Sequence, residues 1–192
     1  MIIDNNFMNE FFDTLTSEAL YNETSFQFEL GNYIKNKYPE YIVEYERNVK
    51  NKNIELDSNI IKQMSETKHS ILLNNRKRFK KEIDIFIYKK DLSEKYAIEL
   101  KFPASKSGYT KAINEFEEDI EFVNFIKENC KNFTDTYCIN ISRHKYLYSG
   151  NKLDITRKRN DITWNEIPNC EILEITDNKN EVEPKYYIYR SK

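Results

Sequence analysis

The segment over residues 81–102, KEIDIFIYKKDLSEKYAIELKF, constrains the fold more than any other part of the chain. Two runs rich in β-branched and aromatic residues, 83–88 and 96–102, flank a short polar stretch, KDLS. This pattern is typical of two antiparallel strands joined by a four-residue loop. A symmetric loop would pair Lys89 with Glu94, and the register of the whole hairpin then follows by counting outwards.

The register decides which side chains share a face, because alternate residues along a strand point to opposite sides. On one side Asp84 stands opposite Glu99, and Lys101 follows two residues further along. The hairpin therefore predicts two carboxylates at one point with an ammonium beside them. Six apolar residues fall on the other side, which we expect to face the core: Ile83, Ile85, Ile87, Tyr96, Ile98 and Leu100.

Two carboxylates directly opposite each other repel, so they share a proton, bind a cation or point into water. Paired oxygens on a stiff hairpin suit a hard ion such as Mg²⁺, which prefers oxygen ligands and phosphate co-ligands. An ammonium nearby can hold a water molecule or offset negative charge on a phosphate, so the arrangement predicts phosphodiester hydrolysis in outline. The alternative is a solvent-exposed face on which Glu82 and Lys101 form a surface ion pair.

Asp84 and the triplet Glu99-Leu100-Lys101, separated by fourteen residues, resemble the D…(D/E)-x-K motif of the PD-(D/E)xK phosphodiesterase superfamily. Both parts lie on expected strands with apolar neighbours, and Ile83 stands where that family often has proline. The resemblance implies an α/β, restriction-endonuclease-like fold, in which an αβββαβ core forms a mixed central sheet flanked by helices. It also implies that Asp84, Glu99 and the Leu100 carbonyl bind Mg²⁺ or Mn²⁺, and that Lys101 acts on the attacking water.

A third carboxylate is expected from the helix before the sheet, because this helix often supplies a Glu to the metal site in the resembled family. The sequence predicts that helix over about 25–37. Glu29 borders its apolar stripe and is the best match for this ligand. Glu23 at the helix start and Glu46 on the following strand are the alternatives.

The remaining elements follow from periodicity and capping signals. Asn22 or Thr24 can cap the helix over 25–37. The other expected elements are a helix or two helical turns over 5–21, strands over 41–49 and 136–141, a long amphipathic helix over 109–129, and a β-rich tail over 142–192 with strand-like runs at 152–156, 171–175 and 186–189.

Residues 51–80 do not belong to a minimal core of this type and are interpreted as an insertion between its first two strands. The insertion ends in a basic run at 76–81, which leads directly into the strand bearing Asp84. Such a run contacts phosphates in a salt-dependent way, or is a solvated strand entry. Asp57 or Ser58 can cap a helix in the insertion that carries Ile60, Ile61, Met64, Ile71 and Leu72.

The composition limits the class of protein. With 192 residues and 39% hydrophobic content, the chain is expected to form a single domain with its core over about 25–141. Its three cysteines form no C-x-x-C pair, so neither a zinc site nor a disulfide framework is indicated. No apolar run is long enough to span a membrane. The acidic start lacks the basic region of a signal peptide. A cytoplasmic location is therefore expected. Two histidines and no glycine-rich phosphate loop argue against histidine metal sites and the common nucleotide-binding folds.

The expected function is therefore a Mg²⁺-dependent nuclease that acts on DNA more than on RNA, with pairing of two copies as a further option. The net charge of −2 means that positive charge for nucleic-acid contact has to be local. Two alternatives remain open. One is a catalytically inactive nucleic-acid- or protein-binding module on the same fold, and the other is a structural partner subunit whose charges only solubilise the sheet.

Overall fold

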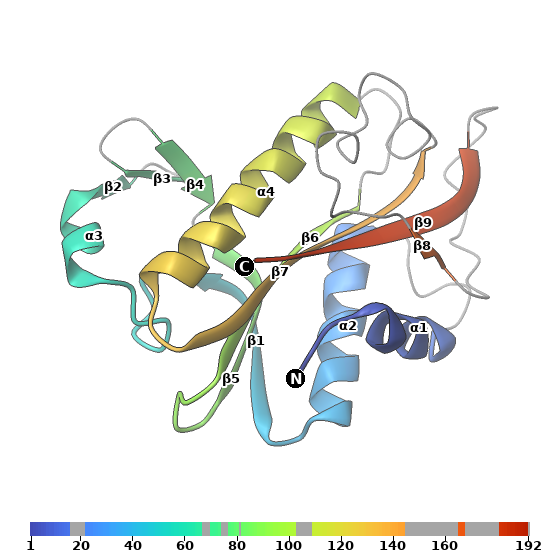
Figure 1. Ribbon diagram of the computed structural model, residues 1–192, viewed down its shortest axis with the longest axis horizontal. Helices are drawn as coiled ribbons and strands as arrows, with labels where there is room; N and C mark the ends of the chain where they lie inside the picture. The colour runs from blue at the N-terminus through green and yellow to red at the C-terminus, as the bar shows by residue number, and fades with distance from the viewer. Residues whose placement is uncertain are drawn as a thin grey trace. The chain divides into compact units, whose positions relative to one another are not determined.

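The computed structural model describes residues 1–15, 22–66, 70–73, 77–80, 82–102, 109–144, 165–167 and 181–191 (Figure 1). Six strands form one sheet in the order β1-β5-β6-β7-β9-β8, and a separate three-stranded sheet has the order β2-β3-β4. In chain order the elements are α1 (Asn5–Asp13), α2 (Glu23–Lys37), β1 (Tyr41–Asn48), α3 (Ser58–Gln63), β2 (Met64–Glu66), β3 (Ser70–Leu73), β4 (Lys77–Lys80), β5 (Glu82–Lys89), β6 (Lys95–Lys101), α4 (Tyr109–Asn129), β7 (Phe133–His144), β8 (Asn165–Glu166) and β9 (Glu181–Arg190).

The chain divides into two compact units, and α2, β6, α4 and β7 each run from one unit into the other. Asp84 and Glu99 belong to the second unit, whereas Lys101 belongs to the first. The first unit consists of Met1–Tyr33, Leu100–Phe116 and Ile139–Tyr189, and the second of Ile34–Glu99, Glu117–Cys138 and Arg190–Lys192.

The hairpin of β5 and β6 has the predicted register. The two strands pair antiparallel, with Ile85 opposite Ile98 and Tyr88 opposite Lys95. At the loop the Lys89 N–H donates to the Glu94 carbonyl at 3.0 Å, which confirms the symmetric closure. Both strands are central in the six-stranded sheet, so the hairpin is a fixed base for whatever its side chains hold.

Both faces of this hairpin are buried, so the alternative of a solvent-exposed second face is wrong. Phe86 and Ala97 lie opposite each other on that face, and Glu99 follows them with 0% of its surface exposed. The cover comes from α4, whose Phe122 and Ile126 pack into one cluster with Phe86 and Ala97. Burial of each of these apolar side chains contributes roughly 1.5–3 kcal/mol to the free energy of unfolding. This burial holds α4 on the sheet.

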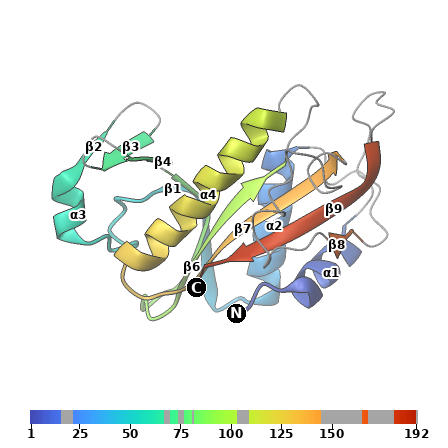
Figure 2. The same cartoon turned by 45° about the horizontal axis from the view of Figure 1, so that its top comes forward.

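The helix α4 has the predicted bounds and connects β6 to β7. The arrows of β6 and β7 point the same way in Figure 2, so the six-stranded sheet is mixed. A crossover helix is the connection that parallel neighbouring strands require. The order α2, β1, β5, β6, α4, β7 is thus the predicted order of helices and strands, interrupted by an insertion between β1 and β5.

The N-terminal helices follow their capping signals. The Asn22 side-chain oxygen accepts from the Ser25 N–H at 2.8 Å, and the Asn22 N–H donates back to the Ser25 hydroxyl at 3.1 Å. This reciprocal pair satisfies two backbone donors and selects Asn22 as the N-cap of α2. Phe11 of α1 packs its ring against Phe26 of α2. Of the predicted helix over 5–21, α1 occupies Asn5–Asp13, and 16–21 lie outside the described residues.

The insertion corrects one prediction. Asp57 caps α3 as expected, but the helix ends at Gln63, and Met64 is already extended. The expected continuation of the helix through Ile71 and Leu72 is wrong, because both residues lie on β3 between β2 and β4. An apolar pair in a short segment fits a strand as well as a helix, and pairing on both sides decides for the strand.

The tail is described only in part. The predicted strand at 186–189 lies within β9, and the short strand β8 pairs with it without having been predicted. The predicted strands at 152–156 and 171–175 lie outside the described residues. Among the described helices, none is both long and apolar enough to cross a membrane.

The loop of the hairpin yields a first prediction. The Glu94 carboxylate accepts from the Tyr41 hydroxyl at 2.6 Å and pairs with Lys89. Hydrogen bonds from Lys89 and Tyr41 lower the pKa of Glu94 to about 2. The folded-state pKa lies below the unfolded value, so the stabilisation is present at neutral pH and is lost as the pH falls towards 2.

We therefore expect Glu94→Gln to lower the free energy of unfolding at pH 7 by about 0.5–1 kcal/mol, the range for a partly solvated pair. At pH 2–3 the variant and the wild type should differ much less. Urea unfolding followed by circular dichroism at both pH values measures this, with exposed Glu40→Gln as the control. An equal difference at both pH values would contradict the prediction.

Candidate functional site

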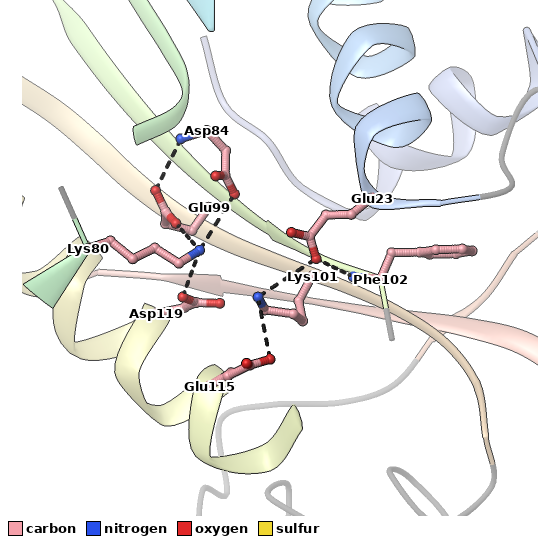
Figure 3. Close-up of polar contacts among 8 residues, drawn as sticks. All are labelled: Glu23, Lys80, Asp84, Glu99, Lys101, Phe102, Glu115 and Asp119. Atoms are coloured by element: carbon pink, nitrogen blue, oxygen red, sulfur yellow. Dashed lines mark hydrogen bonds and ion pairs between the residues drawn. The ribbon is translucent and has the colours of Figure 1, made fainter. Parts of the chain in front are cut away.

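Three carboxylates surround the ammonium of Lys80 (Figure 3). The Lys80 Nζ lies 2.8 Å from Glu99 Oε2, 3.0 Å from Asp119 Oδ1 and 4.0 Å from Asp84 Oδ2. These four residues come from β4, β5, β6 and α4, and all of them belong to the second unit. Elements far apart in the sequence therefore meet around one positive charge.

Two of the acids around Lys80 are shielded from water. Glu99 and Asp119 are 0% and 1% exposed. Burial, and then the Asp84 charge, raise the pKa of Glu99 well above its usual value. Burial alone would lower the pKa of Lys80, but Glu99, Asp84 and Asp119 together outweigh it and raise that pKa. Neighbouring acids raise both pKa values, whereas burial acts in opposite directions, raising the pKa of Glu99 and lowering that of Lys80.

Asp84 and Glu99 meet as the hairpin register predicts. Continuing the register one pair beyond Ile85 and Ile98 places the two acids opposite each other. The Asp84 N–H donates to Glu99 Oε1 at 3.2 Å, which anchors the buried carboxylate to the neighbouring strand. Glu99 thus has one oxygen fixed by the backbone and the other by Lys80.

A second polar group, in the first unit, surrounds Lys101 (Figure 3). Its Nζ lies 3.7 Å from Glu23 Oε2 and 3.8 Å from Glu115 Oε2. Glu23 also accepts from the Phe102 N–H at 3.1 Å, so the first residue of α2 is attached to the end of β6. Lys101 is 9% exposed. Its expected surface partner, Glu82, is exposed on β5.

The three candidates for the third carboxylate have different surroundings. Glu23 lies beside Lys101, as described above. Glu29 is half-buried on α2, and within the described part of the chain its carboxylate makes no hydrogen bond or ion pair, so its role stays a prediction. Glu46 is exposed and has a left-handed backbone, φ 50°. It is the one residue between Tyr45 and Arg47 on β1 and stands at the position opposite Asp84, and the register is the same on both sides of it. Leu100, the predicted carbonyl ligand, is fully buried on β6.

Asp119 is the residue that sequence reasoning missed. In the sequence, Glu115, Glu117, Glu118, Asp119 and Glu121 predict a solvated acidic face of the helix. For Asp119 this prediction is wrong, because its side chain is buried. The signal was its spacing, three residues after Phe116 and four before Val123, both of which have no exposed surface. A charged residue inside an apolar stripe should have been a candidate partner for a buried lysine.

Lys80 was expected to contact phosphate or solvent as part of the basic run 76–81. The structure instead places its ammonium among the three acids, with the side chain 33% exposed. Arg76 and Lys81 lie outside the described residues. The ion pairs of Lys80 therefore attach the end of the insertion to the sheet and to α4.

Oxygen ligands of this kind are those that Mg²⁺ and Mn²⁺ prefer. The carboxylates are nonetheless spaced around an ammonium, and among the residues that the structure describes no group of three or more acidic, histidine or cysteine side chains has the spacing of a metal site. The donor set thus fits a hard divalent cation in chemistry and charge, provided that Lys80 moves and the acids close in. In that case Asp84 and Glu99, the two acids of the motif, would hold the cation.

Comparison of the chain with family models, with curated proteins and with solved structures gives no match. The resemblance to the PD-(D/E)xK superfamily therefore depends on the motif and on the arrangement of the elements. The chemistry of the two polar groups is the basis for any function assigned to the protein.

Asn140 on β7 gives a second prediction. The side chain is fully buried, and in the part of the chain that the structure describes neither its oxygen nor its nitrogen has a hydrogen-bond partner. An unsatisfied buried amide costs about 1–3 kcal/mol. We expect Asn140→Leu, which is similar in size, to raise the free energy of unfolding by about 1 kcal/mol, measured by urea unfolding.

The matched control is Thr136→Val on the same strand. The Thr136 hydroxyl is buried too, but it is hydrogen-bonded to the Val123 carbonyl and the Ser191 hydroxyl, both at 2.7 Å. This variant should lose about 1 kcal/mol of stability. If Asn140→Leu destabilised the protein as much as Thr136→Val, the amide of Asn140 would have a stabilising role after all.

Proposed function

We propose that this protein is a metal-dependent nuclease of the PD-(D/E)xK type, which hydrolyses phosphodiester bonds in DNA more than in RNA. The observation that carries the proposal is the convergence of Asp84, Glu99 and Asp119 on one cation position. Two carboxylates of this set are those of the motif, and they meet on the predicted strands. The order of the elements and the strand order β1-β5-β6-β7 are what an αβββαβ, restriction-endonuclease-like core would have, which supports the proposal.

In this proposal Asp84, Glu99 and the Leu100 carbonyl hold Mg²⁺ or Mn²⁺, and Glu29 holds a second ion or an outer water molecule. Such an ion would, when bound, supply Lewis-acid chemistry towards the water and the phosphate. Lys101 follows Glu99 by two residues on β6, so their side chains leave the strand on the same face. Its ammonium orients the water and offsets the charge that develops on the phosphate oxygens. Glu23 and Glu115 hold Lys101 in position.

The nucleic acid would meet a mildly acidic protein, so its binding has to depend on local positive charge. The basic run 76–81 is the best candidate in the sequence, because it ends where Lys80 reaches the acidic cluster. Binding through such residues weakens steeply with salt. A cytoplasmic location and the pairing of two copies for double-strand cleavage belong to the same proposal.

The test is cleavage of supercoiled plasmid, single-stranded DNA and RNA with Mg²⁺ or Mn²⁺. We expect Asp84→Asn, Glu99→Gln and Lys101→Ala each to lower the rate by about 100-fold or more, because each removes charge stabilisation in the transition state. Glu121→Gln, which removes an exposed acid from α4, should cut at the wild-type rate. Full activity of the Asp84 and Lys101 variants would end the assignment.

A second candidate is a catalytically inactive nucleic-acid- or protein-binding module on the same fold. The observation in its favour is that Lys80 already provides a counter-charge for the acids without any metal. Such a module would bind its partner in the presence of a chelator, and Asp84→Asn would leave that binding unchanged. A purely structural subunit would bind neither metal nor nucleic acid.

A further inference from the structure

We propose that the strands β2, β3 and β4 of the insertion open together as one local unit, and that the ion pairs of Lys80 keep them closed. The closed state is the one described above, in which Glu99 is bonded to Lys80 and has no exposed surface. This inference rests on the proposed function and deepens it, because opening uncovers an acid of the motif and so regulates the proposed site.

The three strands are too short to be stable by themselves. β2 has three residues, and β3 and β4 have four residues each, whereas strands usually have roughly five or six. They pair with one another in a sheet that is separate from the six-stranded one (Figures 1 and 2). Such a small sheet needs support from the rest of the protein. Its order therefore depends on the contacts at the two ends of the insertion.

The insertion is firmly attached to the second unit where it begins. Leu56 forms an isolated β-bridge with Cys130, and Ile54 is fully buried in the same core cluster. Glu55 pairs with Lys95 of β6, which has no exposed surface. Backbone pairing, apolar burial and an ion pair act together here, so we expect this end to stay in place when the strands open.

The other end of the insertion is attached by charge. Lys80 is the last residue of β4, and its Nζ lies 2.8 Å from Glu99 on β6 and 3.0 Å from Asp119 on α4. The strands β3 and β4 share no pairing with the six-stranded sheet. A third of the Lys80 side chain is exposed, so water can replace its partners when the strand moves away. Loss of these ion pairs therefore favours the open state.

Opening of this kind costs less free energy than global unfolding, because it breaks only the contacts of the unit that opens. It removes the ammonium from Glu99, and the carboxylate gains water in exchange. A buried carboxylate without a partner is costly, so the closed state is the resting state. The open state is the minor one, in which Glu99 can be reached from solvent.

The first experiment measures native-state amide hydrogen exchange of the wild-type full chain by nuclear magnetic resonance. We expect the paired amides of β3 and β4 to exchange about 100-fold faster than those of β5 and β6, and to share one free energy of opening. Fraying of separate residues would instead give each amide its own value. Protection of β3 and β4 equal to that of β5 and β6 overturns the proposal.

The second experiment removes the ion pairs. In Lys80→Met we expect β3 and β4 to exchange about tenfold faster than in the wild type, with β7 unchanged, because charged hydrogen bonds are lost. Lys89→Met removes a lysine paired with Glu94 in the hairpin loop and should leave β3 and β4 unchanged. If Lys80→Met does not fold, the double variant Lys80→Met/Glu99→Gln, which has no buried charge left unpaired at position 99, carries the same expectation. Wild-type exchange rates in the variant that folds overturn the proposal.

The third experiment tests whether opening reaches the site. Carboxylates are labelled with a water-soluble carbodiimide and glycine ethyl ester, and each position is quantified by mass spectrometry. Glu99 should be labelled about tenfold faster in Lys80→Met than in the wild type, since the open state is more populated. Exposed Glu121 on α4 is the internal control and should not change. Equal labelling of Glu99 in the two proteins overturns the regulation of the site.

The outcomes separate this inference from the proposed function, because exchange and labelling need no cleavage. Cleavage by the wild type together with unchanged exchange in Lys80→Met overturns the inference and leaves the nuclease intact. Exchange and labelling that respond as expected, without cleavage of any substrate, support the inference and overturn the nuclease.

Discussion

The path of the chain in the second unit depends on one constraint, which is that the buried carboxylate of Glu99 needs partners for its charge. This carboxylate lies in the middle of a central strand with no exposed surface. Leaving such a charge unpaired costs several kcal/mol even after the surroundings relax. Its compensation comes from the Asp84 N–H on β5 and from Lys80 on β4. The chain must therefore return from the insertion to the sheet at the point where Lys80 reaches Glu99, which ties the path of the insertion to one buried acid.

This arrangement is not the one that stability alone would select. Two other buried charges in the described residues have a simple partner, Asp135 with the guanidinium of Arg190 at 2.7 Å and 2.9 Å, and Lys95 with Glu55. Around Lys80, three acids lie within 4.0 Å of one ammonium instead. A buried ion pair is often no more stabilising than a packed apolar group. Local choices that oppose stability are expected at functional sites, so the burial of several charges here marks the cluster as a candidate site.

The sequence predicted those features that depend on local pattern. The hairpin register follows from the symmetric loop between 83–88 and 96–102, and α4 follows from a long apolar stripe. Both predictions were confirmed. The strands β2–β4 were not predicted, because they are only three or four residues long and the single apolar run among them, in β3, fits helix and strand alike. The roles of Lys80 and Asp119 depend on where the insertion and α4 meet the sheet. No local pattern contains that information, although the position of Asp119 within the apolar stripe was a readable signal.

The two lysines of the polar groups each connect several elements within their own unit. Lys101 is 9% exposed at the end of β6 and has Glu23 of α2 and Glu115 of α4 at 3.7 Å and 3.8 Å. Lys80 lies at the end of β4 and makes shorter contacts, 2.8 Å to Glu99 of β6 and 3.0 Å to Asp119 of α4. An ammonium that loses water on burial needs carboxylates nearby to compensate. Each lysine therefore fixes where its acids lie, and through them where the helices meet the sheet within that unit.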